Sequence, residues 1–170
     1  MPERKTIERA LRDKREGKAP TTQAGEFVRE EIEHIREGKH GARSAAQAIA
    51  IGLSKARRAG VDLPPPEKGA ASEKTRRSAQ TALEAGHAKP NAKPSPKRSR
   101  AITEALQHEG QAAASETALA RQAKAAARER SPSERSAAAQ KAVRTKGPAE
   151  RSEAARKAAR TRAARNKAGG

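Results

Sequence analysis

The 170-residue chain contains no cysteine, tryptophan or tyrosine, and Phe27 is its only aromatic residue. Without cysteine, neither a disulfide framework nor a thiolate metal site can form. No segment approaches the roughly 18 consecutive apolar residues of a membrane span. The charged start of the chain has no apolar stretch of the kind found in secretory signals. We therefore expect a cytoplasmic protein that does not associate with membranes.

Large apolar residues are also scarce. Leu, Ile, Val and Phe together number 16, and 11 of them precede residue 64. Chains with high net charge and less than roughly 20% of these four residues are expected to be disordered, and this chain has less than that. Most of the remaining apolar residues are alanine, whose methyl group buries little area. The composition predicts an all-α protein with one small folded unit near the N-terminus, followed by a largely disordered or loosely helical tail.

Changes in composition divide the chain into three regions. Residues 1–66 hold most of the large apolar side chains and end in three consecutive prolines. Residues 67–130 are rich in proline and alanine, and residues 131–170 are basic. We expect a small helical unit, a linker and a basic tail, respectively.

Three helices are expected within residues 1–66, at about 6–17, 25–37 and 44–59. The second has an apolar face and an opposite acidic face, Glu26, Glu30, Glu33 and Glu37, which DNA would repel. Ser44 and Gln47 form a capping box at the start of the third. Because the third helix is apolar nearly all round, it is expected to be buried by the other helices or by a second copy, in a homodimer through residues 44–59.

The tail contains an internal repeat. Residues 131–146 align with residues 147–162, and each copy has a cap residue, then proline, then glutamate two positions later. This order predicts a helix start in both copies, because proline suits the first helical position and glutamate the third.

Positive charge is concentrated in the tail. The chain has 38 basic and 20 acidic residues, a net charge of +18, and no acidic residue follows Glu153. On a helix, the basic residues would project in many directions, which favours contact with phosphates over base recognition. The alternative is a tail that only solubilises the protein. The predicted nucleic-acid contacts in the tail are Arg144, Lys146, Arg156, Lys157, Arg160, Arg162 and Arg165.

A second basic patch is expected around the loop 38–44. This loop precedes the third helix, where free backbone N–H groups attract anions. A DNA phosphate could dock there, or the loop could be an ordinary connection with a helix cap. The predicted contacts are Lys39, Arg43, Lys55, Arg57 and Arg58.

The sequence offers no catalytic or cofactor-binding constellation. His34, His40, His87 and His108 lie in different segments, so we expect no metal site. A catalytic carboxylate pair would need a cleft that this small core cannot build. We therefore expect neither an enzyme nor a small-molecule binding site.

Residues 22–66 resemble a family of small basic bacterial proteins. The resemblance rests on the segments QAGEFVREE, GKHGARS and QAIAIGLSKARRAGV, which cover about a quarter of the chain. Some members are labelled plasmid-stabilisation or DNA-binding proteins. The resemblance implies a bacterial source but no established activity and no assigned site residues. The tail is similar in composition to linker-histone tails and to the tails of bacterial histone-like proteins.

These observations predict sequence-tolerant DNA binding of a nucleoid-associated or plasmid-maintenance kind. One alternative is RNA or ribosome association, against which the lack of stacking aromatic residues argues. The other is a protein-interaction module with a solubilising tail.

Overall fold

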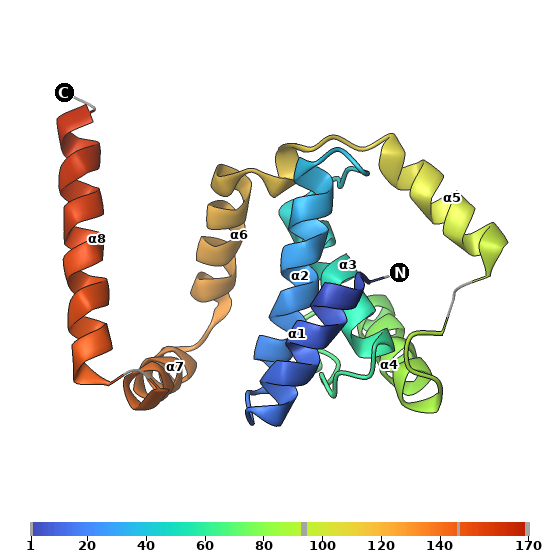
Figure 1. Cartoon of the computed structure of the whole chain (residues 1–170), viewed down its shortest axis with the longest axis horizontal. Helices are drawn as coiled ribbons and strands as arrows, with labels where there is room; N and C mark the ends of the chain where they lie inside the picture. The colour runs from blue at the N-terminus through green and yellow to red at the C-terminus, as the bar shows by residue number, and fades with distance from the viewer. Residues whose placement is uncertain (1, 93–94, 146, 169–170) are drawn as a thin grey trace. The chain divides into compact units, whose positions relative to one another are not determined.

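The computed structural model describes residues 2–92, 95–145 and 147–168 (Figure 1). Over these residues the regular secondary structure is eight α-helices and one short 3-10 helix, which confirms the all-α prediction. None of these helices combines the length and the apolar composition that a membrane span needs. The chain forms two compact units, the first ending at Gln122 and the second beginning at Ala123.

The helices account for most of both units. In chain order they are α1 Arg4–Arg15, α2 Pro20–Arg36, α3 Ala45–Arg58, α4 Glu73–Ala88, α5 Pro96–Gln107, η1 Ala112–Ala114, α6 Glu116–Glu129, α7 Pro132–Thr145 and α8 Pro148–Ala168.

The boundaries of the first helices follow local chemistry. α2 begins at Pro20, earlier than expected, because proline suits the first helical position and Ala19 supplies the extended residue before it. Ser44 caps α3 as predicted, since its hydroxyl accepts the Gln47 N–H at 3.2 Å, but the reciprocal bond of the capping box falls one residue earlier. The Gln47 side chain in turn accepts the N–H of Arg43 at 2.8 Å. Beyond α2, Gly38 takes the positive φ of 75° that suits a helix end.

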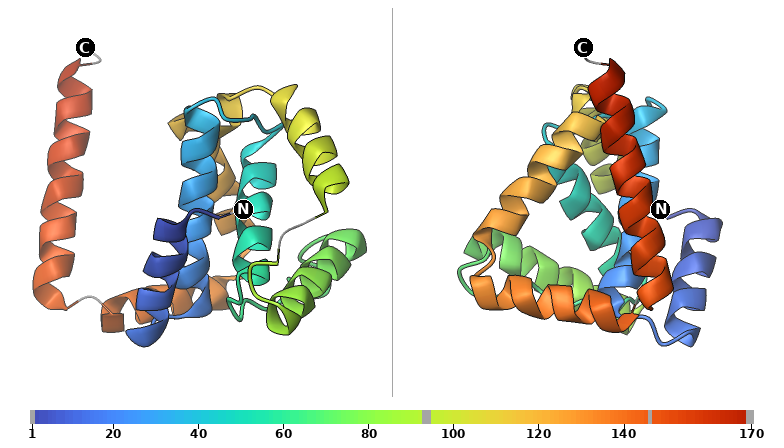
Figure 2. Two further views of the ribbon diagram at one scale, coloured as in Figure 1. Left: turned by 45° about the vertical axis from the view of Figure 1, so that its right-hand side comes forward. Right: turned by 90° about the vertical axis from the view of Figure 1, so that its left-hand side faces the viewer.

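The first four helices pack in sequence order. The left view of Figure 2 shows α1, α2, α3 and α4 following one another from dark blue to green. Two glycines allow the closest approaches: a Cβ at Gly52 of α3 would lie 2.6 Å from Val28 Cα of α2, and one at Gly86 of α4 would lie 1.9 Å from the Arg57 carbonyl oxygen. The backbones of these helices are therefore nearer than any larger residue would permit.

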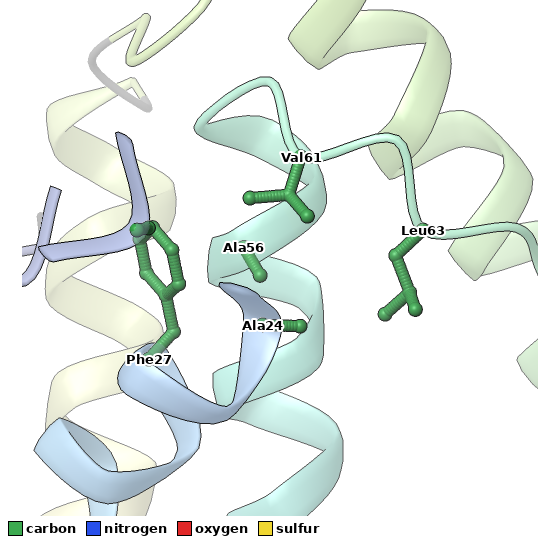
Figure 3. Close-up of a cluster of buried hydrophobic side chains, with 6 residues drawn as sticks. Ala24, Phe27, Ala56, Val61 and Leu63 are labelled. Carbon is green, nitrogen blue, oxygen red and sulfur yellow. The ribbon is translucent and has the colours of Figure 1, made fainter. Parts of the chain in front are cut away.

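The first core cluster lies between α1, α2 and α3. Figure 3 shows Phe27 and Ala24 of α2 with Ala56 of α3 and with Val61 and Leu63 of the following segment. Ala10 of α1 completes the cluster, and Phe27 is 1% exposed. The only Phe, Tyr or Trp side chain of the protein thus packs among three alanines, a valine and a leucine.

A second core cluster joins α2 and α3 to the 3-10 helix η1. Ile32 and Ile35 of α2 pack with Ala48 of α3 and with Ala113 and Ala114 of η1. The Arg36 side chain donates to the Ala114 carbonyl at 2.9 Å, which fixes η1 against α2.

The first unit therefore extends beyond the expected boundary at residue 66. α4 packs along α3, and η1 packs on α2 and α3, although both lie in the region expected to be a linker. Within the first unit, α3 packs against α2, α4 and η1, whereas its Ile49 and Ile51 remain half-buried. The homodimer stays a prediction.

The acidic face expected on α2 is only partly correct. Glu33 and Glu37 are exposed, whereas Glu30 is 2% exposed and its neighbour Glu31 is fully buried. The expectation failed at Glu30 because α2 is covered on more than its apolar face.

Helices α7 and α8 form the basic arm, residues 131–168. Both copies of the repeat begin a helix at their proline, as predicted. Ser131 N–H donates to Glu134 at 2.7 Å, and the Ser131 hydroxyl accepts the Glu134 N–H at 3.2 Å. The tail was expected to be largely disordered or loosely helical, and over its described residues it is helical, because caps and helix-favouring alanine, arginine and lysine support that conformation.

The contact at Gly52 gives a first prediction. Gly52→Ala should lower the free energy of unfolding by about 1–3 kcal/mol, because the added methyl group meets the α2 backbone. Gly25→Ala is the matched control, since nothing lies within 4 Å of that position. In the control, removing glycine from a helix should stabilise the protein by about 0.5–1 kcal/mol. Urea denaturation followed by circular dichroism measures both, and equal effects of the two substitutions would contradict the packing described.

The cap of α7 gives a second prediction. Hydrogen bonds from the Ser131 side chain and backbone hold the pKa of Glu134 below its ordinary value of 4.5. Because the pKa is lowered in the folded state, the ionised carboxylate stabilises α7 at any pH above the ordinary pKa. This stabilisation is lost as the pH falls through the lowered pKa. An NMR titration of the Glu134 carboxyl group should show the low pKa, and Ser131→Ala should raise it. An unchanged pKa in Ser131→Ala would refute the capping contact.

Candidate functional site

The basic arm presents exposed cations on helix α8. Arg156, Lys157, Arg160 and Arg162 are all exposed, and none of them forms an ion pair within the part of the chain that the structure describes. A period of 3.6 residues places the first three on one side of α8 and Arg162 on another. These side chains are therefore available to an external polyanion from more than one direction.

Three further predicted contacts lie in or next to the arm. Arg144 is exposed near the end of α7. Arg165 lies in α8, but its side chain is outside the described part of the structure, and Lys146 lies outside the described residues altogether. The second unit, from Ala123 onwards, has 14 basic and 4 acidic residues, a net charge of +10.

The predicted patch near α3 is not assembled as expected. Arg57 is 6% exposed and donates to the carbonyl groups of Leu63 and Pro64, both at 3.0 Å. Burial lowers the pKa of Arg57. Its guanidinium fastens the chain after α3 onto that helix, so it is not available to a phosphate.

Two other members of that patch also have partners within the chain. Lys55 pairs with the buried carboxylate of Glu31. Lys39 pairs with Glu37 at 2.9 Å and with Glu3 at 3.4 Å, and the hydrogen bond to Glu37 raises the pKa of Lys39. Arg43 and Arg58 alone keep exposed side chains for which the described structure shows no ion pair.

The loop before α3 is also unlike an anion-binding loop. The N–H of Gly41 donates to the Leu106 carbonyl at 2.9 Å, and that of Ala42 donates to the Gly110 carbonyl at 3.0 Å. Both donors are thus used to join the loop to the end of α5 and to the segment that follows it. Of the two interpretations left open by the sequence, an ordinary capped connection fits this geometry better.

A buried ionic cluster lies next to that loop, formed by Glu30, Glu31, His34, His40 and Lys55. Glu31 Oε1 lies 3.3 Å from His40 Nε2, and Glu31 Oε2 contacts Lys55. Neither Glu31 oxygen has a partner with hydrogen-bond geometry within the described residues. A fully buried carboxylate without hydrogen bonds is costly, so its surroundings must supply positive charge.

The other carboxylate of the cluster fixes the start of the chain. Glu30 Oε2 accepts the N–H of Glu3 at 3.1 Å, while Glu30 Oε1 is buried without a hydrogen bond. His34 Nε2 lies 3.0 Å from Glu3 Oε1 and 3.9 Å from Glu30 Oε1. Hydrogen bonds to His34 and Lys39 lower the pKa of Glu3.

Glu31, His34 and His40 could hold a metal ion. One ligand atom from each lies within 4.8 Å of the others. This grouping differs from the expectation that the histidines are too scattered, because the turn after α2 brings His40 back to the end of the helix that carries His34. The spacing of Glu31 and His34, three residues apart on one helix face, is the signal in the sequence that could have indicated it.

No family model matches this chain, and no curated protein or solved structure matches it either. The resemblance of residues 22–66 to small basic bacterial proteins therefore stays a prediction, and function is inferred from the residues of this chain alone.

Proposed function

We propose that the protein binds double-stranded DNA without sequence specificity through the basic arm, in a nucleoid-associated or plasmid-maintenance role. The observation that carries this proposal is the set of four exposed cations on α8 without ion pairs in the described structure. Cations that are not neutralised within the chain can release counterions from a phosphate backbone, which is the main source of non-specific affinity.

The shape of the arm supports duplex DNA as the partner. An α-helix with its side chains is about 10–12 Å across, and the major groove of B-DNA is about 12 Å wide. A helix with cations on more than one side can therefore contact the phosphates of both strands from within the groove. The major groove of A-form RNA is deep and too narrow for a helix, so the same arrangement fits duplex RNA less well.

The residue types of the arm support phosphate contact over base recognition. The exposed side chains of α8 include alanine, lysine and arginine in many directions, and no aromatic residue is present to stack on a base. Arg156 and Arg160 are four residues apart, so their like charges repel on the free helix. Phosphates between them would remove that repulsion, and α8 should gain stability when bound.

Salt dependence provides the test. If about six phosphates are contacted, the logarithm of the association constant should fall with the logarithm of salt concentration at a slope of roughly −5. Replacing four cations should make that negative slope shallower by about 3–4. Fluorescence anisotropy on a 20-base-pair duplex measures this for the full-length chain and for Arg156→Gln, Lys157→Gln, Arg160→Gln and Arg162→Gln combined.

A matched control removes the same charge from the first unit. Lys5, Arg15, Lys68 and Lys74 are exposed, and their combined replacement by glutamine should leave most of the slope unchanged. Equal losses in the two variants, or a wild-type slope near zero, would refute the arm as the binding element.

The nucleic acid is identified in the same assay. Two duplexes of unrelated sequence should bind equally, and both should bind more tightly than duplex or single-stranded RNA of the same length. Tighter binding to RNA would favour the RNA or ribosome alternative. Failure to bind any of them would favour a protein-interaction module.

A further inference from the structure

We infer that Glu31, His34 and His40 form a binding site for one divalent transition-metal ion, of which Zn²⁺ is the practical probe. The three residues come from α2 and from the turn that follows it. Each offers one ligand atom, and all three atoms lie within 4.8 Å of one another. The site lies in the first unit and is independent of the proposed role of the basic arm.

The best-defined pair of ligand atoms has the spacing that a metal ion requires. Glu31 Oε1 and His40 Nε2 are 3.3 Å apart. Bonds of about 2.0–2.2 Å at a tetrahedral angle place two ligands about 3.3–3.5 Å from each other. The observed separation therefore matches two ligands on one ion without movement of either side chain.

The orientation of His40 leaves the correct nitrogen free. Its Nδ1 lies 3.0 Å from the carbonyl oxygen of Gly41, an arrangement in which the Nδ1–H donates to that carbonyl. A backbone carbonyl that accepts the outer N–H of a histidine is the usual partner that orients a metal ligand. When Nδ1 carries the proton of the neutral ring, Nε2 directs a lone pair at the Glu31 carboxylate, and the two repel each other. A cation between them would bind both Nε2 and the carboxylate oxygen and remove that repulsion.

The buried carboxylate gives an independent indication of a cation. Glu31 is fully buried, and neither of its oxygens accepts a hydrogen bond within the described residues. Lys55 contacts Oε2, which leaves Oε1 directed at His40. Glu31 can thus bind a metal through Oε1 while Lys55 holds Oε2, as partners outside the coordination sphere commonly do for ligating carboxylates.

The charges around the site also fit an added cation. The carboxylates of Glu3, Glu30 and Glu31 converge with the ammonium groups of Lys39 and Lys55. Among these groups the carboxylates outnumber the ammonium groups. His34 and His40 are each 13% exposed at the side chain, so an ion can reach the site from solvent.

The ligand types select the class of metal. Imidazole nitrogen suits zinc, copper, nickel and iron, whereas magnesium and calcium prefer sites made of oxygen alone. Two histidines with one carboxylate are a set found in zinc sites that keep a fourth position for water. We therefore expect Zn²⁺ to bind and Mg²⁺ not to compete.

A zinc titration of the full-length chain, without a histidine tag and freed of nucleic acid at high salt, tests the inference. Competition with a chromogenic chelator should show one Zn²⁺ per chain, unaffected by excess Mg²⁺. His40→Gln and Glu31→Gln should each weaken binding at least tenfold. His87→Gln is the matched control and should bind zinc as the wild type does, because His87 pairs with Asp62 away from the site.

A second measurement on the wild type does not depend on the variants folding. One equivalent of Zn²⁺ should shift the imidazole NMR signals of His34 and His40 and leave those of His87 and His108 in place. Absence of stoichiometric binding, unchanged affinity in His40→Gln, or parallel shifts of all four histidines would overturn the inference. In that case the buried carboxylate is balanced by its contact with Lys55.

Discussion

The close approach of α2 and α3 is the contact on which the first unit depends. Gly52 lets the α3 backbone lie against Val28, and this brings Ala24 and Ala56 together beside Phe27. A core built mostly from alanine buries little area per residue. Such a core excludes water only if the helix backbones are close together. Small residues allow that short distance, and the short distance in turn leaves room only for small residues.

The shortage of large apolar residues also explains why charged groups lie inside the unit. Glu30, Glu31, Asp13 and Arg57 are buried, and each has charged or polar groups of the chain around it. Such groups cost free energy when unpaired but specify one arrangement when they are satisfied. The cluster around Glu31 fixes α2, α3 and the intervening turn relative to one another, and its geometry suits a metal ion.

The basic arm follows the opposite principle. None of the described side chains of α8 is buried, so its helical conformation depends on local propensity, the proline at its start and the backbone hydrogen bonds. Its charges are consequently free to meet an external partner, while most of the cations near α3 are used within the first unit. Positive charge that looks similar in composition is therefore exposed in the arm and mostly paired near α3.

Local chemistry was predictable from the sequence. The cap at Ser44, the helix end at Gly38, the proline-led starts at Pro132 and Pro148, and the concentration of cations after Glu153 depend only on neighbouring residues. The tertiary structure decided which charges are buried, that α4 and η1 join the first unit, and that His40 meets His34 and Glu31. These features depend on which helix faces meet, and a chain rich in alanine carries too weak an apolar pattern to specify that locally.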